Sequence, residues 1–123
     1  MPVVARIAVL VVALLHLAFL VLEMFLWTKP FGRKTFGLTR ELAEATKGLA
    51  ANQGLYNGFL AAGLIWGALG GAAAFSIQVF FLVCVIVAGV FGAITAKRSI
   101  LFVQAIPGAL ALVAVWMAYR GMR

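Results

Sequence analysis

The sequence predicts an all-α integral membrane protein: a bundle of four transmembrane helices with a short interfacial helix in the first connection. Composition is the first reason, because 66% of the 123 residues are hydrophobic and the mean hydropathy is +1.16. A soluble chain of this length exposes much of its surface and could not cover so many apolar side chains. The second reason is that these residues gather in four runs, each close to the roughly 20 residues that cross a bilayer. The runs are 7–27, 49–69, 73–96 and 100–119, with a polar connection at 28–48. The whole chain, 1–123, is predicted to form one membrane domain.

The first run begins after Arg6 and ends before Pro30. It is too long for the apolar part of a signal peptide, and no small-residue cleavage site follows it, so we expect a retained helix. Within the polar connection, Thr39 is suited to cap a short helix. The apolar residues of that helix share one face, which favours a position on the membrane surface. They are Leu38, Leu42, Ala45 and Leu49.

Short turns join the remaining runs. Only residues 70–72 separate the second run from the third, so these two helices are expected to form an antiparallel hairpin, and residues 97–99 make the next turn. Pro107 lies inside the fourth run. It has no amide hydrogen for the carbonyl of Val103, so we expect a kink at this point.

The excess of basic residues indicates orientation. There are ten Lys and Arg against three Asp and Glu. In a soluble protein this balance would suggest nucleic acid, but here the basic residues lie in the connections and are expected to contact membrane lipids. Seven of them lie in the first and third connections, and three lie on the other side: Arg6, Arg120 and Arg123. The positive-inside rule therefore predicts that both termini are outside and that the long basic loop is cytoplasmic.

Small residues recur at the spacing that lets membrane helices approach closely. The second run contains Gly54 and Gly58, followed by Gly63, Gly67 and Gly71. Similar spacings of alanine and glycine occur in the third and fourth runs. Two interpretations remain open: tight packing within one bundle, or a homodimer formed through one of the glycine-rich faces.

Polar side chains inside the apolar runs are costly in a membrane and mark candidate functional positions. Because of the alternating direction of the four helices, they are expected to share one layer near the basic loop. The opposite half of the bilayer contains few such residues, so the pattern favours a pocket open to one leaflet over a continuous pore. The candidate binding residues are Glu23, Asn52, Gln53, Tyr56, Asn57 and Gln104.

His16 is the deepest ionisable residue and precedes Glu23 by seven positions, so both project from nearly the same helix face about 10 Å apart. Glu23 and His16 are the candidate catalytic residues, although each also has a structural interpretation. His16 could be a neutral imidazole bonded to another helix, and Glu23 a carboxyl bonded to Asn or Tyr or paired with Lys29. The single cysteine, Cys84, belongs to no metal-binding pattern, and no metal or cofactor is expected.

Three segments resemble one known family. They are residues 22–25 (LEMF), 32–38 (GRKTFGL) and 49–59 (LAANQGLYNGF). The chain resembles the short bacterial membrane proteins of domain-of-unknown-function family 1304 along essentially its whole length. The resemblance implies a four-helix protein of the bacterial inner membrane, and it brings no activity.

Three functions follow as hypotheses. The first is binding, with or without transport, of a lipid-like or amphipathic small molecule in the pocket of one leaflet. The second is a membrane enzyme that acts on an isoprenoid, sterol or lipid, with Glu23 and His16 as acid and base. The third is an accessory or assembly subunit whose glycine faces bind a larger partner.

Overall fold

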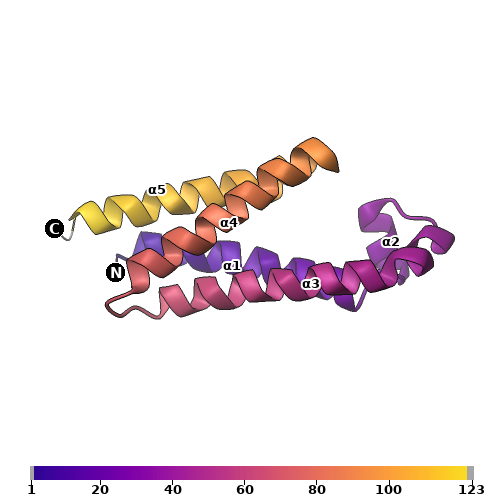
Figure 1. Ribbon diagram of the computed structural model, residues 1–123, viewed down its shortest axis with the longest axis horizontal. Helices are drawn as coiled ribbons and strands as arrows, with labels where there is room; N and C mark the ends of the chain where they lie inside the picture. Colours follow the sequence, from indigo (N-terminus) through magenta and orange to yellow (C-terminus); the bar gives the residue numbers. More distant parts are fainter. Residues whose placement is uncertain (1, 122–123) are drawn as a thin grey trace. The chain divides into compact units, whose positions relative to one another are not determined.

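The computed structural model describes residues 2–121 and is helical throughout, with no strand among these residues (Figure 1). Arg123 is one of the basic residues used above to predict the orientation in the membrane, and it lies outside the described part of the chain. The elements are α1 (Val3–Met24), α2 (Pro30–Phe36), α3 (Arg40–Ala68), α4 (Ala74–Thr95), the π-helix η1 (Leu101–Ala105) and α5 (Ile106–Gly121).

Three helical segments are long and apolar enough to cross a membrane: α1, α4 and residues 101–121, which comprise η1 and α5. The predicted second run is helical as well, as part of α3, but α3 is not among the candidate spans. The polar residues Asn52, Gln53 and Asn57 explain the difference, because they lower the hydropathy of this 29-residue helix.

The predicted interfacial helix after Thr39 is not a separate element, because α3 runs without a break from Arg40 to Ala68. Thr39 does cap this helix, since its Oγ1 accepts a hydrogen bond of 3.1 Å from the amide of Leu42. Most of the predicted apolar face is exposed on the protein. Leu42 is 49% exposed and Leu49 is 76% exposed, whereas the small Ala43 and Ala50 are buried.

A different short helix, α2, occupies the first connection. Pro30 begins it, at a position where the missing amide hydrogen costs nothing. Gly37 ends it in the left-handed conformation, with φ of 67°. The amide of Leu38 bonds to the carbonyl of Arg33 at 2.8 Å, and that of Gly37 bonds to Lys34 at 3.4 Å, which together form a Schellman cap.

The chain forms two compact units. The described residues of the larger unit are 2–15 and 60–121, and the smaller unit comprises 16–59. One hydrophobic core in the larger unit joins α1, α3, α4 and α5, with buried residues spaced three or four apart as in interlocking helices. This core consists of Ala5, Val9, Val12, Ala13, Ala61, Leu64, Ala68, Leu82, Val85, Ala111 and Val115.

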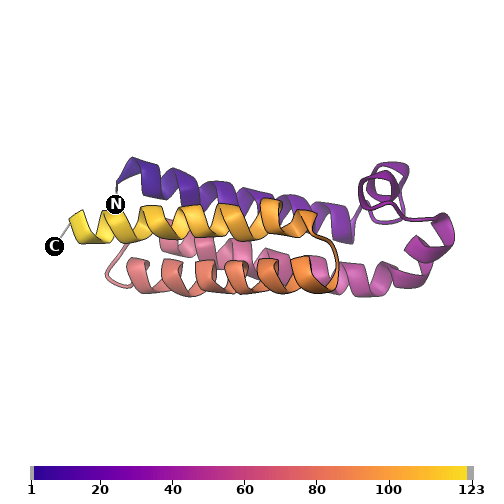
Figure 2. The same ribbon diagram turned by 90° about the horizontal axis from the view of Figure 1, so that it is seen from above.

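Within the larger unit, α4 and α5 run side by side in opposite directions, as both views show (Figures 1 and 2). Gly89 of α4 lies directly against the backbone of Ala105 in η1. A π-helix, η1, precedes Pro107, where the sequence predicts a kink. The amide of Ile106 bonds to the carbonyl of Leu101, five residues earlier, which is the hydrogen-bonding pattern of a π-turn.

Candidate functional site

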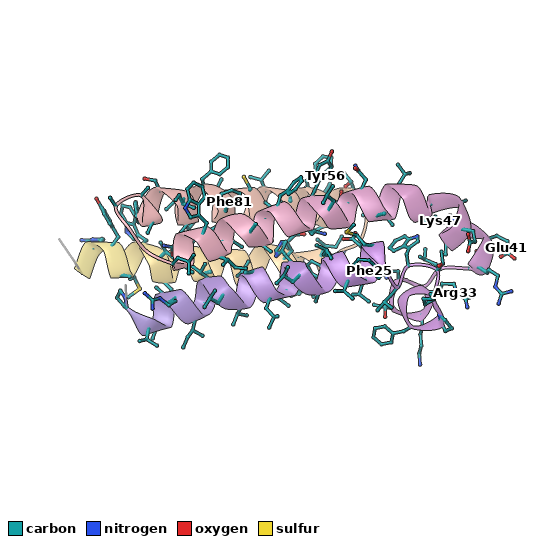
Figure 3. All side chains as sticks on the ribbon, turned by 90° about the horizontal axis from the view of Figure 1, so that it is seen from below. Phe25, Arg33, Glu41, Lys47, Tyr56 and Phe81 are labelled. Carbon is teal, nitrogen blue, oxygen red and sulfur yellow. The ribbon has the colours of Figure 1, made fainter. Side chains whose placement is uncertain are left out.

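A cavity of about 300 Å³ lies in the smaller unit, between the end of α1 with its following turn and the first half of α3. Figure 3 labels two of the side chains that border it, Phe25 from the α1 side and Lys47 from α3. Most of the lining is apolar, and Glu23 and Lys47 supply its charged groups. The lining residues are Glu23, Met24, Phe25, Trp27, Thr28, Lys47, Gly48 and Ala51.

Close packing of α1 and α3 places Glu23 beside this cavity. A Cβ atom at Gly54 would lie 2.7 Å from Met24 Cγ and 3.1 Å from Glu23 Cβ, so only glycine fits there without displacement. One turn later, the side-chain amide of the buried Asn57 donates a hydrogen bond of 2.5 Å to Glu23 Oε1. A bond to an asparagine was one of the structural interpretations of Glu23, and the structure assigns it to Asn57.

Trp27 connects the wall of the cavity to both neighbouring helices. Its indole Nε1 donates a hydrogen bond of 3.0 Å to Thr46 Oγ1 on α3, and its ring contacts Phe36 of α2 with centroids 4.9 Å apart. Thr46 Oγ1 in turn donates to the carbonyl of Leu42 at 2.7 Å. Tryptophan is common at the ends of membrane helices, because its ring is apolar while its N–H is polar.

The α2 helix is held against the turn that follows α1. A Cβ atom at Gly32 would overlap the carbonyl of Leu26, so this glycine permits backbone-to-backbone contact. The next residue, Arg33, has a buried Nε atom without a hydrogen-bond acceptor among the described residues. Figure 3 shows Arg33 within the α2 segment.

Among the described residues, the ammonium group of Lys47 is held only by an exposed ion pair with Glu44. Its Nζ lies 3.1 Å from Glu44 Oε2, but both side chains are more than half exposed. Exposed pairs of this kind contribute little stability, and water screens them strongly. A negatively charged group in the cavity could therefore replace Glu44 as the partner of Lys47 at little cost.

The other predicted binding residues lie elsewhere. Asn52, Gln53 and Tyr56 have exposed side chains and do not line this cavity. Tyr56 packs beside Phe59 with ring centroids 6.0 Å apart, on the side of α3 away from α1 (Figure 3). Gln104 is partly buried in η1, in the larger unit. The polar layer shared by all four helices stays a prediction.

His16 is fully buried and meets the edge of Phe19, with centroids 5.4 Å apart and an interplanar angle of 71°. It does not line the cavity beside Glu23. Among residues 2–121, no three or more His, Cys, Asp or Glu side chains lie close enough to hold a metal ion. Of the residues that line the cavity, sequence reasoning found Glu23 and missed the rest, including Lys47 and Trp27. The position of Trp27, an aromatic residue at the end of an apolar run, could have indicated its role at the membrane interface.

Comparison with known proteins identifies a family. The family described as "Protein of unknown function (DUF1304)" matches residues 10–116, in agreement with the resemblance in the three sequence segments. The chain is similar to the uncharacterized protein YpaA of Lactococcus lactis subsp. lactis (strain IL1403). The two are 30% identical over 108 residues, which cover 86% of this chain and 88% of the relative. No solved structure matches the chain.

Proposed function

We propose that this chain, which belongs to the DUF1304 family, is a membrane protein that binds an amphipathic, lipid-like molecule in the cavity beside Glu23. The observation that carries the proposal is the composition of that cavity: the carboxyl group of Glu23 and the amine of Lys47 in an otherwise largely apolar lining. Transport of the bound molecule between leaflets, or across the membrane, would be an extension of the same binding.

Membrane insertion is supported by the distribution of apolar side chains. Large aliphatic and aromatic residues are exposed on every long helix, such as Leu14 (66%), Trp66 (60%), Ile94 (79%) and Leu110 (66%). Alanine and glycine occupy many of the helix contacts, as expected where lipid surrounds the bundle. We infer that α3 is the fourth span, because it connects two spanning helices and its second half belongs to the same core.

We further propose that the protein lies in the inner membrane of a bacterium, with α2 and the start of α3 on the cytoplasmic side. The Lactococcus relative supports a bacterial source. The basic residues of this segment support the orientation, because positively charged connections stay in the cytoplasm. They are Lys29, Arg33, Lys34, Arg40 and Lys47.

The charges of the cavity indicate the class of ligand. A carboxylate has about four positions that accept hydrogen bonds, and Asn57 occupies one of them on Glu23. An amine or other strong donor on the ligand would use the remaining positions. A phosphate would be attracted by Lys47 and by the nearby basic residues of α2. A phospholipid with an amine in its headgroup satisfies both requirements, with its acyl chains in the surrounding bilayer.

Native mass spectrometry of the protein released from its own membranes tests this proposal. Glu23→Gln removes the charge but keeps an oxygen that can accept the Asn57 bond, so the fold should survive. Glu41→Gln is the matched control, because it makes the same chemical change on an exposed residue of α3. We expect a discrete lipid on the wild type and on Glu41→Gln, and its loss from Glu23→Gln.

The same experiment separates the two other hypotheses. Detection of the wild-type protein without a bound lipid would refute binding at this cavity. Retention of the same lipid by Glu23→Gln would refute it as well. A second protein chain in place of a lipid would favour the accessory or assembly role. A chemically altered lipid that accumulates only with the wild type would favour an enzyme. The enzyme would then use Glu23 without direct help from His16, which does not line the cavity.

A further inference from the structure

A buried glutamine in the larger unit has an acceptor without a partner. Gln78 lies in the second turn of α4 and is only 2% exposed. Its side-chain Nε2 donates to the carbonyl oxygens of Gly67 and Ala74, both at 3.0 Å. Its Oε1 is buried and has no hydrogen-bond donor among the described residues.

The orientation of this amide is fixed by its partners. The oxygens of Gly67 and Ala74 can only accept hydrogen bonds, so the NH₂ group must face them. An amide turned by 180° would place oxygen against oxygen and lose both bonds. The unpaired atom is therefore the oxygen, and a ligand that pairs with it must be a donor.

The packing of α3 against α4 has made room for this side chain. A Cβ atom at Gly67 would lie 2.6 Å from Gln78 Cγ and 3.3 Å from its backbone nitrogen. A leucine or methionine would fill the same space without leaving a polar atom unpaired. Buried polar atoms that lack a partner are rare in folded proteins, and they call for an explanation such as a bound molecule.

Gln78 also lines a cavity of about 260 Å³. The cavity lies between the α3–α4 loop, the first turns of α4 and the last turns of α5, which meet at one end of the larger unit (Figures 1 and 2). The rings of Phe75 and Tyr119 stack in its wall, with centroids 3.9 Å apart and an angle of 18°. One water takes about 30 Å³, so the cavity could hold a molecule the size of a small aromatic ring.

The lining determines the chemistry of that molecule. The described residues around the cavity are all uncharged, and they include glycine, alanine and valine beside the aromatic pair. A charged ligand would be left without a counterion in an apolar site, which is costly. A neutral molecule with a flat apolar body suits the aromatic wall, and one hydroxyl donor would satisfy Gln78 Oε1.

We propose that this cavity is a second binding site, which takes a small neutral phenol-like or alcohol-like molecule whose hydroxyl group donates to Gln78 Oε1. The site is independent of the cavity beside Glu23, since it lies in the other unit and uses none of the same residues.

Fluorine NMR tests this proposal with the full chain in phosphatidylcholine nanodiscs. The probes are 4-fluorophenol and 4-fluoroanisole, which differ in that only the phenol can donate a hydrogen bond. Protein-free nanodiscs give the contribution from partition into lipid. We expect saturable binding of the phenol to the protein, about fivefold or more tighter than any binding of the anisole, as one hydrogen bond provides.

Two variants and one control locate the binding. Gln78→Met keeps the length of the side chain but removes the acceptor, so phenol affinity should fall to that of the anisole. Ala118→Leu places three more carbons in the cavity wall and should abolish the binding of both probes. Glu41→Gln, at an exposed residue that lines neither cavity, should bind the phenol as the wild type does.

The comparison of phenol and anisole binding to the wild-type protein tests the proposal even if a variant fails to fold. Absence of saturable phenol binding, or equal binding of phenol and anisole, would overturn the proposal. Unchanged phenol affinity in a folded Gln78→Met protein would overturn it as well, because the hydrogen bond to Oε1 would then contribute nothing.

Discussion

The close contact between α4 and η1 makes Gly89→Ala a demanding test of the packing. A Cβ atom at this position would lie 2.6 Å from the nitrogen of Ala105, 2.9 Å from its Cα and 2.9 Å from its Cβ. None of these atoms can rotate away, unlike the end of a flexible side chain. The backbone of η1 would have to move by about 0.9 Å to restore a separation of roughly 3.5 Å.

The expected cost combines two opposing effects. Forcing an extra methyl group into a packed contact costs about 1–3 kcal/mol, and a rigid backbone neighbour favours the upper part of that range. Alanine recovers up to about 1 kcal/mol, because it favours the helical conformation more than glycine does. The net free energy of unfolding should fall by about 1–2 kcal/mol, a change of roughly 5–30-fold in the equilibrium between folded and unfolded protein.

Equilibrium unfolding in mixed detergent micelles, followed by far-UV circular dichroism, measures this change. Gly48→Ala is the matched control, because Gly48 lies inside α3 and a Cβ atom there meets no heavy atom within 4 Å. The control should be as stable as the wild type or more stable by up to about 1 kcal/mol. If Gly89→Ala is as stable as the wild type, then the backbones of α4 and η1 are not in close contact.

Three further predictions concern the smaller unit. Thr39→Ala should lower stability by about 1 kcal/mol through loss of the α3 cap, and an unchanged unfolding midpoint would contradict this. Trp27→Phe keeps an aromatic ring but loses the bond to Thr46, so amide exchange in α2 should accelerate by roughly fivefold. Equal exchange rates would show that the bond does not hold this segment. Asn57→Leu should destabilise the protein by about 1.5–3 kcal/mol, because it leaves the Glu23 carboxyl without its partner on α3. If Asn57→Leu is neutral in the same unfolding assay, the bond is not structural.

The sequence predicted helices over the four apolar runs and the two short turns between the last three, because the lengths of these segments leave little choice. The α2 helix was missed although both of its signals are present in the sequence. Pro30 was interpreted only as the end of α1, whereas proline is also favoured in the first turn of a helix. Gly37, seven residues later, is the matching residue just beyond the end.

The buried face of α3 could not be predicted from hydrophobicity. A search for large apolar residues selects Leu42 and Leu49, which are exposed, and passes over Ala43 and Ala50, which are buried. Where lipid replaces water, large side chains gain nothing by facing the protein, and small ones permit close helix contact. The first half of α3 therefore buries small side chains and exposes leucines, whereas Leu64 is buried in its second half.

The candidate site was predicted in part. Glu23 was selected because a carboxyl group in an apolar helix is costly, and a bond to an asparagine was one of three interpretations left open, beside a bond to a tyrosine and a pair with Lys29. The cavity itself depends on how α1 and α3 pack through Gly54, and no sequence pattern shows the empty space beside Met24. Asn52 and Tyr56 share the polar run with Asn57 but point to other faces, since they lie five and one positions before it on a helix.

The most direct test of the central claim is photocrosslinking with an amine-bearing phospholipid that carries a diazirine next to its headgroup. Peptide mapping should place the crosslinks in residues 23–28 and 47–51 of the wild type and of Glu41→Gln, with a strong reduction in Glu23→Gln. Crosslinks spread over the exposed faces of α1, α4 and α5, or an unchanged pattern in Glu23→Gln, would contradict a lipid-binding cavity at this carboxylate.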